Sequence, residues 1–424
     1  MSFKNISVIG LGYIGLPTAA MFAAYGKNVI GVDVSKKAVD TINRGEIHIV
    51  EPDLDTIVHK AVSERKLRAV LVPEPADAFL IAVPTPFQPT DNEEIPRPDL
   101  KYIKAATLAI APVLKKGDLV ILESTSPVGA TEQMAEWLAA ARLDLTFPQT
   151  HGSNSDIRVA HCPERVLPGH VVRELVENDR VIGGMTSKCS KTATELYKTF
   201  VTGECVVTNA RTAEMAKLTE NSCRDVQIAF ANELSIICDE LDIDVWELIS
   251  LANRHPRINI LQPGPGVGGH CIAVDPWFIV SKNPEQAKLI HAARKVNDAK
   301  PEWVVNKVKL AVADFLLANP SKTANDVRIT CFGLAFKPDI DDLRESPSMS
   351  IAQEIATNHP SLVNFVEPNI QSLPKGACEN AILIDFESAL KKTDIAVVLV
   401  DHSEFKTLND IPSEVRLVDT KGIW

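Results

Sequence analysis

Three glycines near the N-terminus constrain the fold more than any other feature of the chain. Gly10, Gly12 and Gly15 form the pattern G-x-G-x-x-G directly after an apolar run at residues 6–9 and before a helix-compatible segment. Glycines in this pattern allow a tight turn and bring backbone N–H groups to the N-terminus of a helix, where anions are favoured. The pattern predicts the strand, turn and helix that open a dinucleotide-binding α/β domain.

Asp33 strengthens this prediction, because it closes the next expected strand, residues 28–32. A carboxylate at that position can accept hydrogen bonds from ribose hydroxyls and repels a 2′-phosphate, so NAD is preferred over NADP. Further strands are expected at 78–83 and 119–123. Strands that alternate with helices predict a doubly wound parallel sheet.

The middle of the chain is predominantly helical. Residues 210–240 lack proline and place apolar side chains at helical spacing, which predicts one long helix that joins two domains and forms a homodimer interface. Helices are also expected at 245–253 and 285–317, the second with a break at Pro301.

A second α/β alternation begins after this helical part. The expected strands are at 327–334, 364–367, 395–400 and 417–420. The fold class is therefore α/β, with two Rossmann-like doubly wound domains joined by a central helical domain. The predicted boundaries are 1–209 for the NAD-binding domain, 210–319 for the helical domain and 320–424 for the C-terminal α/β domain.

Composition excludes several classes of function. The net charge of -11 argues against a nucleic-acid or membrane-surface binder, which needs a basic face. The apolar run at 6–24 is interrupted by glycines and Pro17, so we expect neither a signal peptide nor membrane insertion. Eight cysteines without a C-x-x-C pair fit neither a zinc site nor a disulfide framework, which indicates a cytoplasmic protein without a metal.

Cys271 differs from the other cysteines because it directly follows the glycine-rich segment at 263–270. A cysteine that adds to an aldehyde lets a nicotinamide enzyme oxidise one carbon twice, from alcohol to aldehyde and from thiohemiacetal to thioester. Water then releases an acid. The combination of Cys271 with the dinucleotide pattern predicts a four-electron dehydrogenase.

A second candidate set lies on the expected long helix. Lys217, Asn221 and Arg224 occupy positions i, i+4 and i+7, which is one helix face. Such a set is usually a solvated charged face. An ammonium beside an amide is, however, also what a sugar alkoxide needs for stabilisation.

The ordered motifs resemble the UDP-glucose/GDP-mannose dehydrogenase family along essentially the whole chain. They are the opening glycines, the segments 83–86 and 123–125, Pro163-Glu164, Lys217 with Asn221, the cysteine loop, and the segments 336–338 and 344–346. Members that oxidise UDP-glucose typically have Pro-Glu-Phe and a Lys-Asp after the cysteine, whereas this chain has Pro163-Glu164-Arg165-Val166 and Val274-Asp275-Pro276. Its blocks at 164–169 and 264–271 are similar to those of the UDP-N-acetylhexosamine branch.

The resemblance implies oxidation of UDP-N-acetyl-D-mannosamine at C6 to the uronic acid, for a cell-surface polysaccharide such as enterobacterial common antigen. It implies that Cys271 is the nucleophile, held as thiolate by nearby cations or backbone N–H groups. Lys217 matches a lysine that transfers a proton or steadies the oxyanion, and Asn221 shares the oxyanion. Asp275 matches an aspartate that activates water or relays a proton, with Thr125 and Glu164 assisting hydrolysis.

The resemblance also implies the ligand contacts. The NAD contacts are Gly10, Gly12, Tyr13, Ile14, Gly15, Asp33, Thr85, Thr125 and Arg344. The UDP-sugar contacts are Arg165, Val166, Lys217, Asn221, Arg224, His255, Arg257, Gly268, Phe336, Lys337 and Arg416. Arginines suit this role because one guanidinium can donate hydrogen bonds to two diphosphate oxygens at once.

Three alternatives remain at this point. Another UDP-sugar, UDP-N-acetylglucosamine or UDP-glucose, is one. A two-electron hydroxyacid or phosphogluconate-type dehydrogenase also pairs a lysine with an asparagine four residues on, but it needs neither the cysteine nor a C-terminal nucleotide domain. A non-catalytic NAD-sensing scaffold would leave Cys271, Lys217 and Asp275 without a task.

Overall fold

The computed structural model describes residues 3–49, 51–88, 95–166, 169–269, 271–374, 376–408 and 411–424. The chain divides into two compact units, Met1–Glu220 with Trp277–Lys282, and Asn221–Pro276 with Asn283–Trp424. This division does not test the predicted boundaries at 209/210 and 319/320, which stay a prediction.

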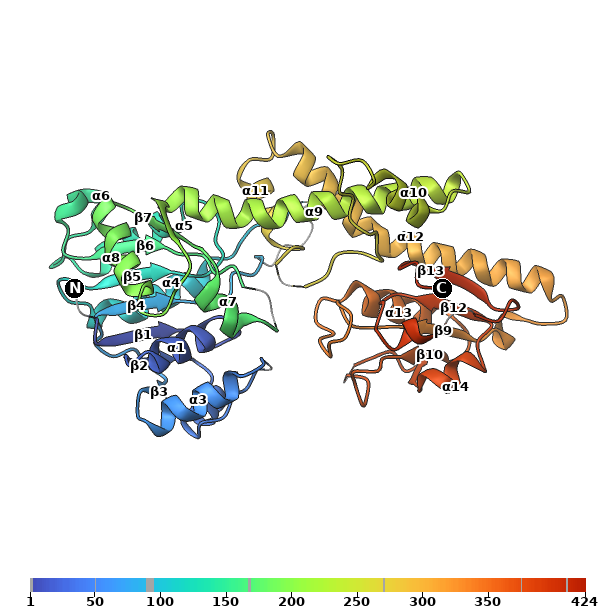
Figure 1. Ribbon diagram of the computed structural model, residues 1–424, viewed down its shortest axis with the longest axis horizontal. Helices are drawn as coiled ribbons and strands as arrows, with labels where there is room; N and C mark the ends of the chain where they lie inside the picture. The colour runs from blue at the N-terminus through green and yellow to red at the C-terminus, as the bar shows by residue number, and fades with distance from the viewer. Residues whose placement is uncertain are drawn as a thin grey trace. The chain divides into compact units, whose positions relative to one another are not determined.

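The first unit is built on one sheet. Its strands are β1 (Asn5–Ile9), β2 (Asn28–Val32), β3 (Leu67–Val70), β4 (Ala78–Ile81), β5 (Leu119–Leu122), β6 (Arg158–His161), β7 (Arg180–Gly184) and β8 (Cys205–Asn209). In the described residues they follow the order β3-β2-β1-β4-β5-β6-β7-β8 (Figure 1). All neighbours are parallel except β6 and β7. The predicted doubly wound α/β class is confirmed, with one antiparallel pair that the sequence did not indicate.

Helices cover both faces of this sheet. They are α1 (Gly15–Ala24), α2 (Lys36–Asn43), α3 (Leu54–Ser63), α4 (Lys101–Ile110), α5 (Ala130–Ala141), α6 (Pro148–His151), α7 (Val171–Glu177) and α8 (Ser187–Tyr197). Side chains of α1, α3, α7 and α8 pack with Leu80 and Ile121 on one face. Side chains of α4 and α5 pack with Phe79 and Val120 on the other face. Neighbouring strand residues thus enter opposite cores, because side chains alternate along a strand.

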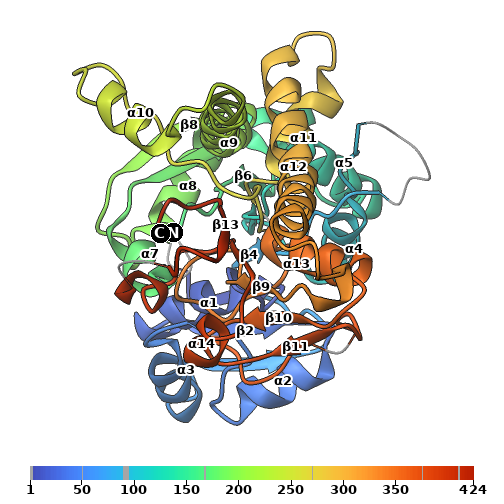
Figure 2. The same ribbon diagram turned by 90° about the vertical axis from the view of Figure 1, so that its right-hand side faces the viewer.

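The second unit contains a smaller sheet of the same topology. Its strands are β9 (Ile329–Phe332), β10 (Val363–Val366), β11 (Ala381–Leu383), β12 (Ile395–Val398) and β13 (Arg416–Asp419), in the order β11-β10-β9-β12-β13 with every described pair parallel. The helices α12 (Lys288–Ala318) and α13 (Pro347–Asn358) pack on one face, and α14 (Phe386–Leu390) packs on the other (Figure 2). The second predicted α/β alternation is confirmed.

The remaining helices are α9 (Ala210–Glu240), α10 (Val245–Ala252) and α11 (Asp275–Lys282). The structure confirms the predicted helix at 210–240, residue for residue, while α11 was not predicted. The predicted break at Pro301 is wrong, because α12 continues through it. Proline removes one backbone hydrogen bond from a helix. The burial of Val304, Val305 and Val308 in the core of the second unit stabilises α12 beyond that point.

No helix in the described part of the chain combines the length and apolar character that crossing a bilayer requires.

Candidate functional site

The turn between β1 and α1 contains three glycines, and at two of them a side chain would not fit. Gly10 has a φ of 90°, and a Cβ atom there would collide with the backbone of Ala82, which follows β4. A Cβ atom on Gly15 would collide with the carbonyl of Gly10. Gly12 differs, because a Cβ atom there would meet nothing within 4 Å. Packing of the protein does not explain this glycine, whereas a ligand that approaches the backbone would.

The N-terminus of α1 is open to an anion. Ile14 precedes the helix without a side-chain hydrogen bond, and the first turn contains no acidic residue. The helix dipole and the first N–H groups favour a negatively charged group there. Tyr13 is exposed and Ile14 half-buried beside this turn.

Asp33 follows β2 and reaches across to the same turn. Its Oδ2 accepts a hydrogen bond from Leu11 N at 2.9 Å, and its Oδ1 accepts one from Ser35 N at 2.8 Å. Each carboxylate oxygen has a second lone pair, so the side chain can hold the turn and still accept hydroxyl donors. The position therefore fits the ribose contact that the sequence predicts.

Thr85 and Thr125 follow β4 and β5 at the same edge of the sheet, and both are half-buried. The Oγ1 atom of Thr85 is buried and has no hydrogen-bond partner among the described residues. A buried hydroxyl without a partner is costly. A bound polar group would satisfy it, and the residues of this unit fit a dinucleotide.

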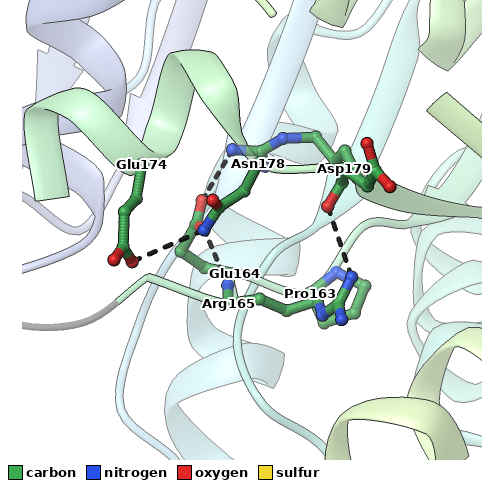
Figure 3. Close-up of a pocket in the computed structure, with 7 residues that line it drawn as sticks. Pro163, Glu164, Arg165, Glu174, Asn178 and Asp179 are labelled. Atoms are coloured by element: carbon green, nitrogen blue, oxygen red, sulfur yellow. Dashed lines mark hydrogen bonds and ion pairs between the residues drawn. The ribbon is translucent and has the colours of Figure 1, made fainter. Parts of the chain in front are cut away.

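Glu164 lies after β6 in a small pocket of about 10 Å³, lined by Pro163, Glu164, Arg165, Glu174, Asn178, Asp179 and Arg180 (Figure 3). The carboxylate is buried and held at both oxygens. Oε1 accepts a hydrogen bond from Arg165 N at 2.7 Å, and Oε2 accepts one from Arg180 Nη2 at 2.8 Å. Two donors, one at each oxygen, fix the orientation of the carboxylate.

The other predicted contacts near Glu164 already have partners within the first unit. The Arg165 guanidinium pairs with Glu220 at 2.7 Å and donates a hydrogen bond to the Asp179 carbonyl at 3.2 Å. Val166 packs against the core. A diphosphate would have to compete with Glu220 for Arg165.

The cysteine loop belongs to the second unit and packs against the segment that precedes α13. A Cβ atom on Gly268 would lie 2.6 Å from the Glu345 carbonyl oxygen and 3.1 Å from the Cβ atom of Phe336. The backbone N–H of Gly264 donates to Asn232 Oδ1 at 2.9 Å. The absence of a side chain at Gly268 thus permits the close approach of Phe336 to the loop.

Cys271 is exposed at the turn that leads into α11. Its carbonyl accepts hydrogen bonds from Val274 N at 3.1 Å and Asp275 N at 2.9 Å. Lys337 lies close enough to interact electrostatically with both Cys271 and Arg224. Burial lowers the pKa of the Lys337 ammonium, Cys271 acts in the opposite direction, and Arg224 lowers it further. The structure therefore brings three predicted residues together and places one cation, Lys337, within electrostatic range of the thiol, which favours a thiolate.

Asn221 and Asp275 also meet, 54 positions apart in sequence. The Asn221 Nδ2 atom donates to Asp275 Oδ2 at 2.5 Å, and Asp275 is buried. One N–H of the amide is therefore engaged by the carboxylate. This contact fixes the orientation of the predicted oxyanion donor relative to the predicted proton acceptor.

For the remaining predicted residues, the structure gives a position and an exposure. Lys217 is half-buried on α9 in the first unit, whereas Asn221 and Arg224 belong to the second. His255 and Arg257 are exposed after α10, where Arg257 N donates to His255 Nδ1 at 3.3 Å. Arg416 is exposed at the start of β13.

Arg344 is exposed as well, and its guanidinium pairs with Asp342 at 2.6 Å. For this residue and for those named above, ligand contact stays a prediction.

Two residues around Glu164, Arg180 and Glu123, were not predicted to be functional, although Glu123 begins the motif at 123–125. Arg180 opens the apolar strand β7, and Glu123 follows the apolar strand β5. Each is a charge at the end of a buried strand, which is rare unless the charge is paired. That signal was present in the sequence.

Three models of one family match the chain in succession. The UDP-glucose/GDP-mannose dehydrogenase family matches with its NAD binding domain over residues 4–201, its central domain over 211–299 and its UDP binding domain over 330–424.

Individual relatives align over the whole chain. It is 65% identical to the UDP-N-acetyl-D-mannosamine dehydrogenase of Yersinia pestis, over 100% of both chains. It is 62% identical to the NDP-N-acetyl-D-galactosaminuronic acid dehydrogenase of Ralstonia nicotianae, over 100% of this chain and 97% of the relative. Among solved structures, a UDP-D-ManNAc dehydrogenase from Pyrococcus horikoshii is similar, with 36% identity, a TM-score of 0.85 and coverage of 99% of this chain and 96% of the other.

Proposed function

Because the chain belongs to the UDP-glucose/GDP-mannose dehydrogenase family and is a NAD-dependent dehydrogenase, we propose that it oxidises UDP-N-acetyl-D-mannosamine at C6. The product is UDP-N-acetyl-D-mannosaminuronate, formed by four-electron oxidation. The identity of 65% over the whole length to the Yersinia pestis enzyme supports this substrate. The observation that carries the chemistry is the exposed Cys271 thiol with Lys337 within electrostatic reach.

The reaction needs two oxidations and one hydrolysis. NAD, when bound, accepts a hydride in each oxidation. Between them, the Cys271 sulfur adds to the C6 aldehyde and forms a thiohemiacetal, which the second oxidation converts to a thioester. Water then attacks the thioester carbon, the C–S bond breaks, and Cys271 leaves as thiolate. One alcohol, two NAD⁺ and one water thus give one carboxylate, two NADH and three protons.

We assign the proton transfers and oxyanion contacts to five residues. Lys217 steadies the C6 oxygen or exchanges its proton, and Asn221 donates to the same oxygen. Asp275, which accepts a hydrogen bond from Asn221 Nδ2, activates water or relays a proton. Glu164, fixed by Arg165 N and Arg180, accepts the proton of the attacking water, with Thr125 assisting.

We propose the following contacts for the two ligands. In the first unit, the turn at Gly10, Gly12 and Gly15 with Tyr13, Ile14, Asp33, Thr85 and Thr125 holds NAD. Arg344 is proposed to complete these contacts. The UDP-sugar contacts are Arg165, Val166, Lys217, Asn221, Arg224, His255, Arg257, Gly268, Phe336, Lys337 and Arg416.

We further propose the predicted three-domain division, a cytoplasmic location and a homodimer that forms through α9. Phe230, Ile237 and Leu241 support the dimer, because they are large apolar side chains exposed on or just after α9. Light scattering tests the dimer, since an active monomer would refute this interface.

We also propose a use for the product. It would serve as a sugar donor in the synthesis of a cell-surface polysaccharide of the enterobacterial common antigen type.

A second candidate substrate has its own support. The relative from Ralstonia nicotianae is named for N-acetyl-D-galactosaminuronic acid and is 62% identical. The two uronic acids differ in the configuration of the sugar ring at C2 and C4. One or two contacts can decide between them.

The decisive experiment counts NADH per UDP-sugar consumed, with excess NAD. UDP-N-acetylmannosamine, UDP-N-acetylgalactosamine, UDP-N-acetylglucosamine and UDP-glucose are each run to completion. Two NADH with the mannosamine sugar alone are expected. One NADH would mean an aldehyde product and an idle Cys271, and turnover of another sugar instead would reassign the substrate.

A further inference from the structure

A buried cluster of charges surrounds the Glu164 carboxylate within the first unit. Arg180 on β7 donates from Nη2 to Glu164 Oε2 at 2.8 Å, and its Nη1 lies 3.7 Å from Glu123 Oε1. The guanidinium stands over the ring of Tyr197, 4.5 Å from the centroid. Tyr197 in turn donates its hydroxyl to Glu123 Oε1 at 2.5 Å. One cation is therefore contacted by the residues that follow β5 and β6 and by α8.

The two carboxylates do not share Arg180 equally. Glu164 accepts a hydrogen bond from the guanidinium, whereas the contact to Glu123 is longer than a hydrogen bond. Neither Glu123 Oε2 nor Arg180 Nη1 has a hydrogen-bond partner among the described residues. A guanidinium donates best in the plane of its fork, so the short bond fixes the orientation of Glu164.

The other buried groups that the structure describes around Arg180 carry no positive charge. Cys162 lies beside it, and burial raises the pKa of that thiol far above its usual range, so it stays uncharged. The pKa of Tyr197 is also raised by burial. Arg180 is thus the buried cation that binds Glu164, and its loss would leave that carboxylate with the Arg165 N–H as its only donor among the described residues.

We propose that Arg180 is a positioning residue for the hydrolytic half of the reaction. It holds the Glu164 carboxylate in a fixed orientation, while Glu123 and Tyr197 hold Arg180. This inference rests on the proposed role of Glu164 as acceptor of the proton from water. In that step the water O–H bond breaks toward Glu164, the new C–O bond forms, and the C–S bond to Cys271 breaks.

The thioester on Cys271 is the species that distinguishes a role in hydrolysis from a structural role. If Arg180 serves hydrolysis, its removal slows thioester breakdown without slowing the two oxidations. The variant then forms two NADH per subunit in a rapid phase and continues slowly, with the sugar still attached to Cys271. A purely structural role would lower the number of active molecules and leave no attached sugar.

The experiment compares Glu164→Gln, Arg180→Met and Arg180→Lys with the parent, by rapid-mixing NADH absorbance and intact-mass measurement of quenched enzyme. Glu164→Gln and Arg180→Met are expected to show the two-NADH burst, the mass of the bound acyl group, and a steady rate lower by about tenfold or more. Arg180→Lys keeps the charge and should recover part of the steady rate. It also covers the case in which Arg180→Met does not fold.

Arg158→Met is the matched control. Arg158 is likewise a buried arginine of the same sheet, but it opens β6, at the end of that strand opposite Glu164. Its removal should lower the melting temperature and produce no bound acyl group.

The possible failures can be told apart. A parent that forms one NADH or none overturns the proposed function and this inference with it. A parent that forms two, with a bound acyl group in Glu164→Gln but none in either Arg180 variant, overturns the role of Arg180 alone.

Discussion

The two sheets open with the same turn and use it differently. In both, a glycine with positive φ follows the first strand, Gly10 at 90° and Gly333 at 87°. In both, an acid after the second strand accepts N–H groups of that turn, Asp33 from Leu11 and Glu367 from Leu334 and Ala335.

The differences lie in burial and capping. Glu367 is buried, and His402 Nε2 lies 3.0 Å from its Oε2. Burial alone would raise the pKa of Glu367, but the hydrogen bonds from His402 and from Leu334 N hold it below its usual value.

The helices that follow the two turns also differ. The helix α13 is capped by Ser346 Oγ, which accepts a hydrogen bond from Met349 N. Asp33 stays accessible and α1 is uncapped.

Topology alone therefore does not decide which sheet binds a dinucleotide. The first turn leaves its acid and helix N-terminus to a ligand, whereas the second satisfies both internally. The second instead inserts the segment 334–346 between strand and helix, and this segment carries Lys337 toward Cys271.

The largest effect is expected from the loop that only the second unit has. Cys271→Ala should reduce acid formation by about a thousandfold or more, since the covalent step is lost. Both NAD and the UDP-sugar should still bind, as measured by calorimetry. Acid formation at the parent rate would refute the covalent mechanism and the distinction between the two units.

Next in size is a pH effect on stability in the first unit. Burial raises the pKa of Glu123 from 4.5 to about 7. Its contribution to stability is then fully present below pH 4.5 and is lost as the pH rises through 7, by about 3 kcal/mol. Glu123→Gln should therefore gain stability relative to the parent between pH 5 and 8 in urea unfolding. A constant difference across that range would contradict the shift.

The second unit should show the opposite slope. Burial lowers the pKa of Lys300 from 10.5 to about 7, and its Nζ donates to Ser235 Oγ at 2.5 Å beside Trp303. Stability from this group is present above pH 10.5 and is lost as the pH falls through 7. The free energy of unfolding of Lys300→Met, relative to that of the parent, should therefore be higher at pH 6 than at pH 10. The same urea unfolding measures it. Equal differences at the two pH values would argue against a neutral amine.

A fourth test fills the open turn between β1 and α1 with a side chain. Gly12→Val should weaken NAD binding by about a hundredfold, because the added side chain occupies space that the protein leaves empty. The melting temperature without ligand should change little. Gly333→Ala is the contrasting variant, since its Cβ would collide with Val400 and lower stability directly. Unchanged NAD affinity in Gly12→Val would place the pyrophosphate elsewhere.

The smallest effect concerns the two acids. Asp33→Ala should weaken NAD by about tenfold, the loss of a charge-assisted hydrogen bond to ribose, and leave UDP-sugar affinity unchanged. Glu367→Gln should lower stability and leave NAD affinity unchanged. If titration shows that both variants lose NAD equally, the internal role of Glu367 is wrong.

Local patterns made much of this protein predictable. The glycine turn, Asp33 and the strand at 28–32 could be found because turn geometry and apolar runs are short-range signals. The helix at 210–240 followed from periodicity, and β9, β10, β12 and β13 from alternation with helices. Pro301 shows the limit, because local propensity predicted a break that burial of α12 in the second core overrode.

By itself, then, the sequence determined the α/β class, the dinucleotide turn and the cysteine loop, since each is written in residues close together in the chain. Only the tertiary structure decided that Arg180 binds Glu164, that Asn221 contacts Asp275 and that Lys337 lies within electrostatic range of Cys271. The physical reason is that these contacts join segments brought together by sheet topology and core packing, which no local pattern encodes.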